Sequence, residues 1–162
     1  MPSSGSESPN TPPVRRATPG DAPQVARLLY DFNSEFNEPT PEVETLEGRY
    51  SELIRNREMI VLLIGDGPDG FAQLRFRPWV HTAGLASYLE ELYVVPDLRG
   101  NGLGRALLEA AMETARAEGA DYMDLGTSET DEAARHLYES AGFTNREGDP
   151  DGPVMLFYER EL

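Results

Sequence analysis

The chain of 162 residues contains no cysteine and no lysine. The absence of cysteine excludes disulfide scaffolds, zinc–thiolate sites, iron–sulfur clusters and thiol nucleophiles. The absence of lysine excludes Schiff-base catalysis and a phosphate loop of the Walker type. The only histidines, His81 and His136, lie far apart, so neither a metal-ligand spacing nor a histidine-based triad is present. We therefore expect chemistry that uses no metal.

The charge is strongly one-sided, because 14 arginines stand against 29 acidic residues and give a formal net charge of −15. Binding to nucleic acid or to an anionic membrane needs a basic surface, so neither partner is expected. The acidity serves either solubility or the attraction of a cationic partner, and composition leaves both open.

Residues 1–13 (MPSSGSESPNTPP) are rich in serine and proline. They lack the basic start and apolar centre of a secretory signal, and we expect a disordered tail followed by one domain over residues 14–162. No apolar run approaches the roughly 18 to 20 residues of a membrane span. The missing signal favours a cytoplasmic location.

Apolar periodicity predicts an α/β domain. Two amphipathic helices are indicated early, one starting at a capping-box-like Asp21-x-x-Gln24 and one between Pro41 and Asn56. Two further helices are expected at 102–118 and 131–141, each followed by glycine. Strands are expected at 14–17, 59–64, 71–79, 88–95, 122–125, around 143 and at 154–158. The order β-α-α-β-β-β-α-β-α-β-β favours a mixed sheet flanked by helices.

Residues 92–105 lead from a strand through a glycine-rich turn into a helix. Glycines there expose backbone N–H groups beside the positive end of the helix dipole, which suits a phosphate group. The glycines run G-x-G-x-G, which is not the spacing of a dinucleotide-binding turn. Arg99-x-x-Gly102-x-Gly104 instead resembles the R/Q-x-x-G-x-G/A pattern of the GCN5-related N-acetyltransferases (GNAT), which hold the pyrophosphate of acetyl-coenzyme A on this turn.

Two flanking segments extend this resemblance. Residues 88–96 (YLEELYVVP) resemble the central strand of the family, and residues 131–143 (DEAARHLYESAGF) resemble its second signature, N-x-x-A-x-x-L/F-Y-x-x-x-G-F. Asp131 departs from the usual Asn, and a carboxylate cannot donate a hydrogen bond as an amide can. This puts a direct contact with the cofactor in doubt, and a helix N-cap role suits Asp131 equally well.

The resemblance implies an N-acetyltransferase with the GNAT fold that uses acetyl-coenzyme A as co-substrate. Val94 and Val95 would act through their backbone groups, which pair with the cofactor like an added strand. Without cysteine there is no acetyl-cysteine relay, so direct transfer is expected. The positions expected to bind the cofactor are Val94, Val95, Arg99, Gly100, Asn101, Gly102, Leu103, Gly104, Arg105 and Asp131.

Acetyl transfer requires a base for the ammonium and an acid for the leaving thiolate. Tyr138 matches the tyrosine acid of the family, although its place on an apolar helical stripe also fits packing. Glu90 and Glu91 are adjacent on a strand, and alternation directs one to each face. The segment LEELYV is similar to one in spermidine/spermine acetyltransferases, and it favours Glu90 as base and Glu91 as a charge attractor or solvated residue. Which of the two is the base stays open.

The expected acceptor is a small cationic amine, polyamine-like or aminoglycoside-like. Acidic residues that could line its entrance are Glu35, Glu38, Glu42, Glu44, Glu47, Asp149 and Asp151. Trp79 either packs in the fold or contacts the acceptor, and neither histidine receives a role. Two alternatives remain, a protein or peptide acetyltransferase and a non-catalytic sensor of acyl-coenzyme A. The resemblance also allows a homodimer.

Overall fold

The computed structural model describes residues 10–162, so most of the expected tail at residues 1–13 lies outside the described range. The chain divides into two compact units, Met1–Asp124 and Leu125–Leu162. The first unit holds a β-sheet and three α-helices, and the second holds a fourth helix and the C-terminal segment.

The sheet of the first unit has the strand order β1-β2-β3-β4-β5. Its strands are β1 (Val14–Arg16), β2 (Ile60–Ile64), β3 (Gly70–Pro78), β4 (Leu85–Val94) and β5 (Ala120–Leu125). The pairs β1–β2, β2–β3 and β3–β4 are antiparallel. Leu85 N–H donates to the Gly119 carbonyl and Ser87 Oγ donates to the Tyr122 carbonyl, so β4 and β5 advance in the same direction. The expected mixed sheet is confirmed.

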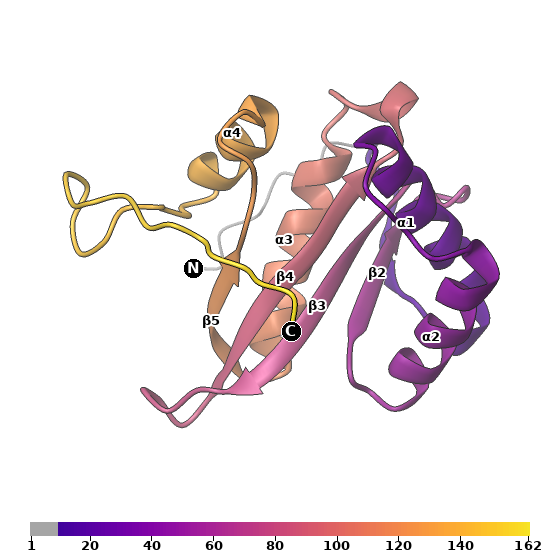
Figure 1. Ribbon diagram of the computed structural model, residues 1–162, viewed down its shortest axis with the longest axis horizontal. Coiled ribbons are helices and arrows are strands. Elements are labelled where there is room, and N and C mark those ends of the chain that lie inside the picture. The colour runs from indigo at the N-terminus through magenta and orange to yellow at the C-terminus, as the bar shows by residue number, and fades with distance from the viewer. Residues whose placement is uncertain (1–9) are drawn as a thin grey trace. The chain divides into compact units, whose positions relative to one another are not determined.

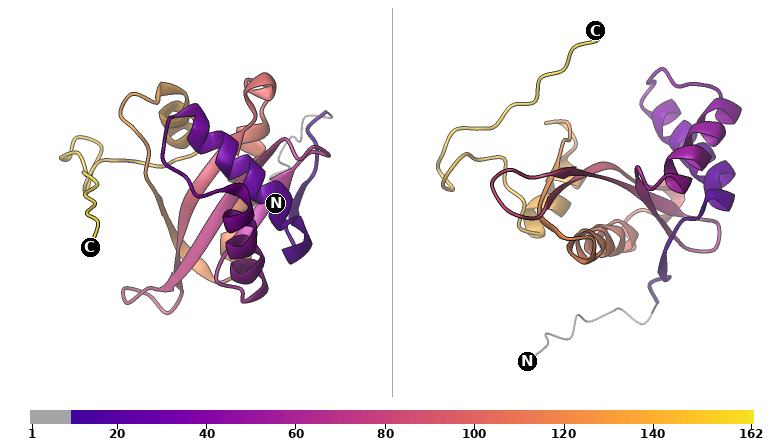
Figure 2. Two further views of the ribbon diagram at one scale, coloured as in Figure 1. Left: turned by 45° about the vertical axis from the view of Figure 1, so that its right-hand side comes forward. Right: turned by 90° about the horizontal axis from the view of Figure 1, so that it is seen from below.

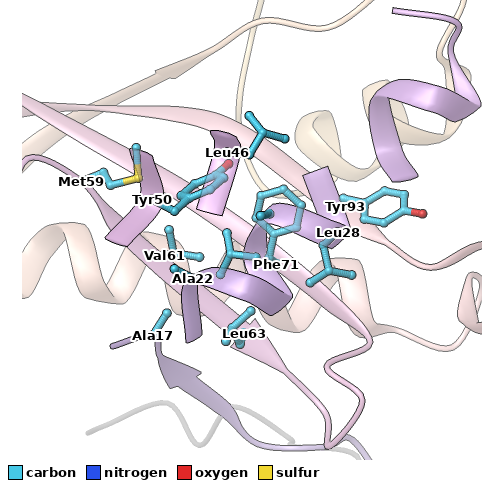
Figure 3. Close-up of a cluster of buried hydrophobic side chains, with 12 residues drawn as sticks. Ala17, Ala22, Leu28, Leu46, Tyr50, Met59, Val61, Leu63, Phe71 and Tyr93 are labelled. Carbon is cyan, nitrogen blue, oxygen red and sulfur yellow. The ribbon is translucent and has the colours of Figure 1, made fainter. Parts of the chain in front are cut away.

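Helices lie on both faces of the sheet (Figure 1, Figure 2). The helices α1 (Ala22–Glu35) and α2 (Val43–Arg55) pack together on one face, and α3 (Leu103–Ala117) lies against the other. Figure 3 shows the core under α1 and α2, where Leu28, Tyr50 and Phe71 are buried. All of β2 is buried because helices cover both of its faces, which explains its continuous apolar sequence.

Strand β4 contains a β-bulge at Glu90. Gln73 pairs with Glu91 and Leu74 pairs with Leu89, so Glu90 is an extra residue without a partner on β3. A bulge breaks the alternation of side chains along a strand. Glu91 shares the face of its partner Gln73, and the Glu90 carboxylate accepts hydrogen bonds from Gln73 and Arg75 on that same face. The prediction that Glu90 and Glu91 point to opposite faces is therefore wrong.

The start of α1 also differs from its prediction. The Asp21 carboxylate accepts from the Thr18 N–H at 2.8 Å and from the Arg15 guanidinium at 2.8 and 2.9 Å. It therefore stabilises the preceding 3-10 turn η1 (Pro19–Asp21) and does not cap α1. The capping box with Gln24 is wrong because the Asp21 carboxylate is held by two groups that precede the helix, the Arg15 guanidinium and the Thr18 N–H.

The second unit holds α4 (Glu132–Ser140). As in α3, the helix is followed by a glycine in the left-handed region, Gly142 at φ +94°. Among the described residues no strand follows α4, and a single antiparallel bridge joins Arg146 and Val154. The expected strands around 143 and at 154–158 are not formed, and the side chains from Val154 to Tyr158 are exposed. An apolar, β-branched pattern indicates that a segment could pack in a sheet. The segment forms a strand only if a neighbouring strand is available to pair with it.

Candidate active site

The glycine-rich turn joins β4 to α3 through a 3-10 turn, η2 (Pro96–Leu98). Gly100 and Gly102 have φ of +79° and +83°, in the left-handed region that favours glycine. A Cβ at either position would meet no atom within 4 Å, so the backbone conformation and not crowding requires glycine here. Gly102 is the N-cap of α3 and has no side chain to accept from the first N–H groups of the helix. These groups are oriented as an anion site requires.

The other predicted residues of the turn support this geometry. Leu103 is buried and anchors the first turn of α3 in the core. Asn101 Nδ2 donates to the Leu98 carbonyl at 3.1 Å, which closes the turn on itself. Arg105 is exposed in the first turn of the helix, beside Gly104. The segment therefore combines helix N–H groups with a nearby cation, a combination that fits a pyrophosphate.

Arg99 ties α1 to the turn. Its guanidinium forms two hydrogen bonds with the Glu35 carboxylate, at 2.6 and 2.7 Å, and its Nε donates to the Val94 carbonyl at 2.9 Å. The hydrogen bonds from Arg99 hold the pKa of Glu35 below its ordinary value. The Val95 N–H donates to the Asp69 carbonyl at 2.9 Å. Two of the backbone groups expected to pair with the cofactor thus have partners within the chain.

Glu90 and Glu91 share a face but have different surroundings. Glu90 Oε2 accepts from Gln73 Nε2 and, at 3.0 Å, from Arg75 Nε. The Glu91 carboxyl makes no hydrogen bond or ion pair with any residue in the range 10–162. Burial, together with the charges of Glu90 and Glu38, raises the pKa of Glu91 to about 7. The Glu91 side chain is partly buried, and its role as a charge attractor, a solvated residue or a base stays a prediction.

Sequence analysis missed the residues that support Glu90. Tyr50 on α2 donates its hydroxyl to Gln73 Oε1 at 2.6 Å, and this orients the Gln73 amide so that Nε2 faces Glu90. Tyr50 and Gln73 are both buried, and Arg75 is partly exposed. The available signal was Gln73 itself, a polar residue within an apolar strand and two positions before Arg75.

A family model described as Acetyltransferase (GNAT) family matches residues 24–143. The chain belongs to this family. Its members use acetyl-coenzyme A as co-substrate, and the match spans α1, the bulge of β4, the glycine-rich turn and α4. The expected family and the expected class of enzyme, an N-acetyltransferase, are confirmed.

Three relatives illustrate the breadth of the similarity. This GNAT chain is 30% identical over 139 residues to YhfO of Bacillus subtilis, described as an uncharacterized N-acetyltransferase, with 83% of this chain and 91% of the relative covered. It is 38% identical over 89 residues to an aminoglycoside N(6')-acetyltransferase type 1 of Klebsiella aerogenes, covering 51% and 59%. A solved Arthrobacter sp. FB24 structure, of a candidate acetyltransferase, is 44% identical with a TM-score of 0.86, covering 96% and 99%.

Two predicted site residues of this GNAT chain, Asp131 and Tyr138, belong to the second unit. The Asp131 carboxylate accepts from the Ala134 N–H at 3.0 Å, which confirms its N-cap role. The Tyr138 ring meets the Phe143 ring edge-on with 6.1 Å between centroids, which confirms its aromatic packing. Contact of Asp131 with the cofactor and acid catalysis by Tyr138 stay predictions.

Trp79 stacks on Tyr122 with 4.6 Å between ring centroids, and His81 lies 4.8 Å from the Trp79 ring. The packing interpretation of Trp79 is confirmed. Within residues 10–162, no group of acidic and histidine side chains is arranged to hold a metal ion. None of the helices in this range combines the length and hydrophobicity needed to cross a bilayer.

Proposed function

We propose that this protein transfers the acetyl group of acetyl-coenzyme A directly to a primary amine of a small cationic molecule, polyamine-like or aminoglycoside-like. The observation that carries the proposal is the pair of carboxyls at the bulge of β4, Glu90 and Glu91, which precedes the anion-binding turn on the same strand. An aminoglycoside acetyltransferase among the relatives supports a polycationic acceptor.

The turn at 99–105 provides the cofactor site in this proposal. The N–H groups at the start of α3 and the Arg105 guanidinium bind the pyrophosphate, and Asn101 and the left-handed glycines Gly100 and Gly102 hold the backbone in the required shape. Bound acetyl-coenzyme A supplies a thioester whose carbonyl carbon accepts the amine. The ion pair of Arg99 with Glu35 fixes the turn against α1, so Arg99 acts by positioning the turn.

Different side chains carry out two proton transfers of the reaction, one from the ammonium and one to the thiolate. The acidic pair takes the ammonium proton, which frees the nitrogen lone pair to attack the carbonyl carbon. The Val94 N–H stabilises the oxyanion that forms, and the C–S bond breaks when the intermediate collapses. The amine nitrogen, positively charged after the attack, loses its second proton to solvent, which leaves the neutral amide. Tyr138 donates its proton to the departing thiolate and is reprotonated from solvent. The acetyl group passes directly from the sulfur of coenzyme A to the amine nitrogen, so no acetyl-enzyme forms.

The test is the release of free thiol from acetyl-coenzyme A across a panel of amines and lysine peptides. We expect turnover with polycationic amines by the wild type and by Glu109→Gln, a control on the exposed face of α3. Tyr138→Phe should lower kcat by about 10²-fold or more. Coenzyme A binding without turnover of any acceptor would indicate a sensor, and turnover of peptides alone would indicate a protein acetyltransferase.

The order of the reaction is tested by initial rates measured while both substrates are varied. Direct transfer in a ternary complex predicts intersecting lines in the double-reciprocal plot. Parallel lines would indicate a covalent acetyl-enzyme and would contradict the proposed chemistry.

A further inference from the structure

We infer that Glu91 is the catalytic base of this site and that Glu90 is a positioning residue, held by Gln73 and Arg75, which keeps a negative charge beside Glu91. The inference rests on the proposed acetyl transfer. It differs from the resemblance to spermidine/spermine acetyltransferases, which favours Glu90 as the base.

The bulge of β4 brings the two carboxyls together. In a regular strand, neighbouring side chains point to opposite faces, and one of the two would face α3. Because Glu90 is the extra residue of the bulge, both side chains lie on the face that α1 and α2 cover. Two carboxyls on one face of a strand interact as like charges, and one of them then binds a proton more readily.

Hydrogen bonds distinguish the two carboxyls. Glu90 Oε2 accepts from the Arg75 guanidinium and from the Gln73 amide, and both bonds favour the ionised form. The oxygen of the Gln73 amide accepts from the Tyr50 hydroxyl on α2, and its Nε2 faces Glu90. Protonation of Glu90 would weaken its ion pair with Arg75, so Glu90 is poorly suited to accept the ammonium proton.

Glu91 has the opposite surroundings. Its side chain is partly buried, and its carboxyl receives no hydrogen bond from residues 10–162. The groups that face it are Tyr50 from α2, Glu38 from the segment between α1 and α2, and Gln73, Arg75 and Glu90 from the sheet. Two of these three charged groups, Glu38 and Glu90, are negative, and they raise the affinity of Glu91 for a proton.

This proton affinity suits a base that works at neutral pH. Ionised Glu91 accepts a proton from the acceptor ammonium, so an N–H bond breaks, an O–H bond forms and the nitrogen lone pair becomes the nucleophile. The proton then leaves to solvent, which restores the carboxylate for the next turnover. A base with a pKa near the working pH combines a large ionised fraction with strong proton affinity.

The experiment measures kcat/KM against pH for a polycationic amine, in the wild type, Glu91→Gln, Glu90→Gln and the control Glu109→Gln. The wild type and the control should lose activity on the acidic side with a midpoint near 7. Glu91→Gln should lower kcat by about 10²-fold and abolish this acidic limb. Glu90→Gln should retain the limb but move it to lower pH, because the neighbouring charge that raises the pKa of Glu91 is gone.

The reverse result, a limb that persists in Glu91→Gln and disappears in Glu90→Gln, would overturn the inference. Carbon-13 NMR titration of the side-chain carboxyls gives a second readout that needs no turnover. We expect the Glu91 resonance of the wild type to titrate near 7 and that of Glu90→Gln to titrate lower. Titration of Glu90 near 7 would also overturn the inference. Failure of the wild type to acetylate any amine would instead refute the proposed function, and the NMR result would still decide which carboxyl holds the proton.

Discussion

A partly buried carboxyl that receives no hydrogen bond from the described residues lowers the stability of the fold once it ionises. The pKa of Glu91 is about 7 in the folded chain, whereas an unperturbed glutamate has a pKa of about 4.3. Between these values the folded chain binds more protons than the unfolded chain, so the free energy of unfolding falls as pH rises through this window. The ionised form of Glu91, which the proposed mechanism requires, therefore lowers the free energy of unfolding.

The first prediction follows from this cost. Glu91→Gln should raise the free energy of unfolding at pH 8 by about 2 kcal/mol. The gain should shrink to a few tenths of a kcal/mol at pH 4, where the wild-type carboxyl is protonated in the folded state and mostly protonated in the unfolded state. Urea denaturation at the two pH values measures the difference. An equal effect at both would show that ionisation of Glu91 does not limit stability.

Backbone conformation gives a second prediction at the residue scale. Gly102→Ala places a side chain at φ +83°, which costs about 1–2 kcal/mol in stability or forces the turn to change shape. In either case the affinity for coenzyme A should fall, as binding calorimetry would measure. The matched control is Gly48→Ala in α2, where there is open space and no positive φ, and it should gain about 0.5–1 kcal/mol. Unchanged affinity in Gly102→Ala would place the cofactor elsewhere.

At the scale of elements, the contact between α1 and the glycine-rich turn includes a partly exposed ion pair, Arg99 with Glu35. The pKa of Glu35 is lowered by Arg99, so the pair stabilises the fold above the ordinary glutamate pKa, and the effect is lost as pH falls through the pKa of the folded state. Glu35→Gln should therefore lower the free energy of unfolding by about 0.5–1 kcal/mol at pH 7 and have little effect at pH 3. Urea denaturation tests this, and a loss of equal size at pH 3 would contradict it.

Most helices and strands were predictable from sequence because each is encoded locally. The apolar stripes of α1 to α4 and the run of β2 reflect which side of each element is buried, and the glycines after α3 and α4 mark their ends. The bulge at Glu90 was not predictable, because it is a property of how β4 pairs with β3. The last two expected strands failed for a related reason, since a strand needs a partner that its own sequence does not specify.

In the candidate site, too, some features are encoded locally and others depend on contacts between distant residues. The glycines of the turn and the two adjacent carboxyls were identified from their sequence positions alone. The different surroundings of Glu90 and Glu91 were not, because they depend on Gln73 and Arg75 from another strand and on Tyr50 from α2. A sequence shows which groups can carry protons, whereas their relative proton affinities depend on contacts made across the fold.

At the scale of the whole molecule, the net charge of −15 should act on association with a cationic acceptor. We predict that kcat/KM for a polyamine decreases as ionic strength rises from about 0.01 to 0.15 M, over which the screening length shortens from about 30 to 8 Å. A monoamine acceptor provides the control and should show a weaker dependence. A value of kcat/KM that does not change with salt would indicate that the acidic residues serve solubility and do not attract the acceptor.

The central step of the proposed function is the transfer of an acetyl group to an amine. Mass spectrometry of a polycationic amine, incubated with acetyl-coenzyme A and the protein, detects this product directly. We predict an amine acetylated at a primary nitrogen, formed together with an equal amount of free coenzyme A and strongly reduced in Glu91→Gln. A wild type that binds coenzyme A but yields no acetylated amine from any polyamine or aminoglycoside tested would contradict the proposed function.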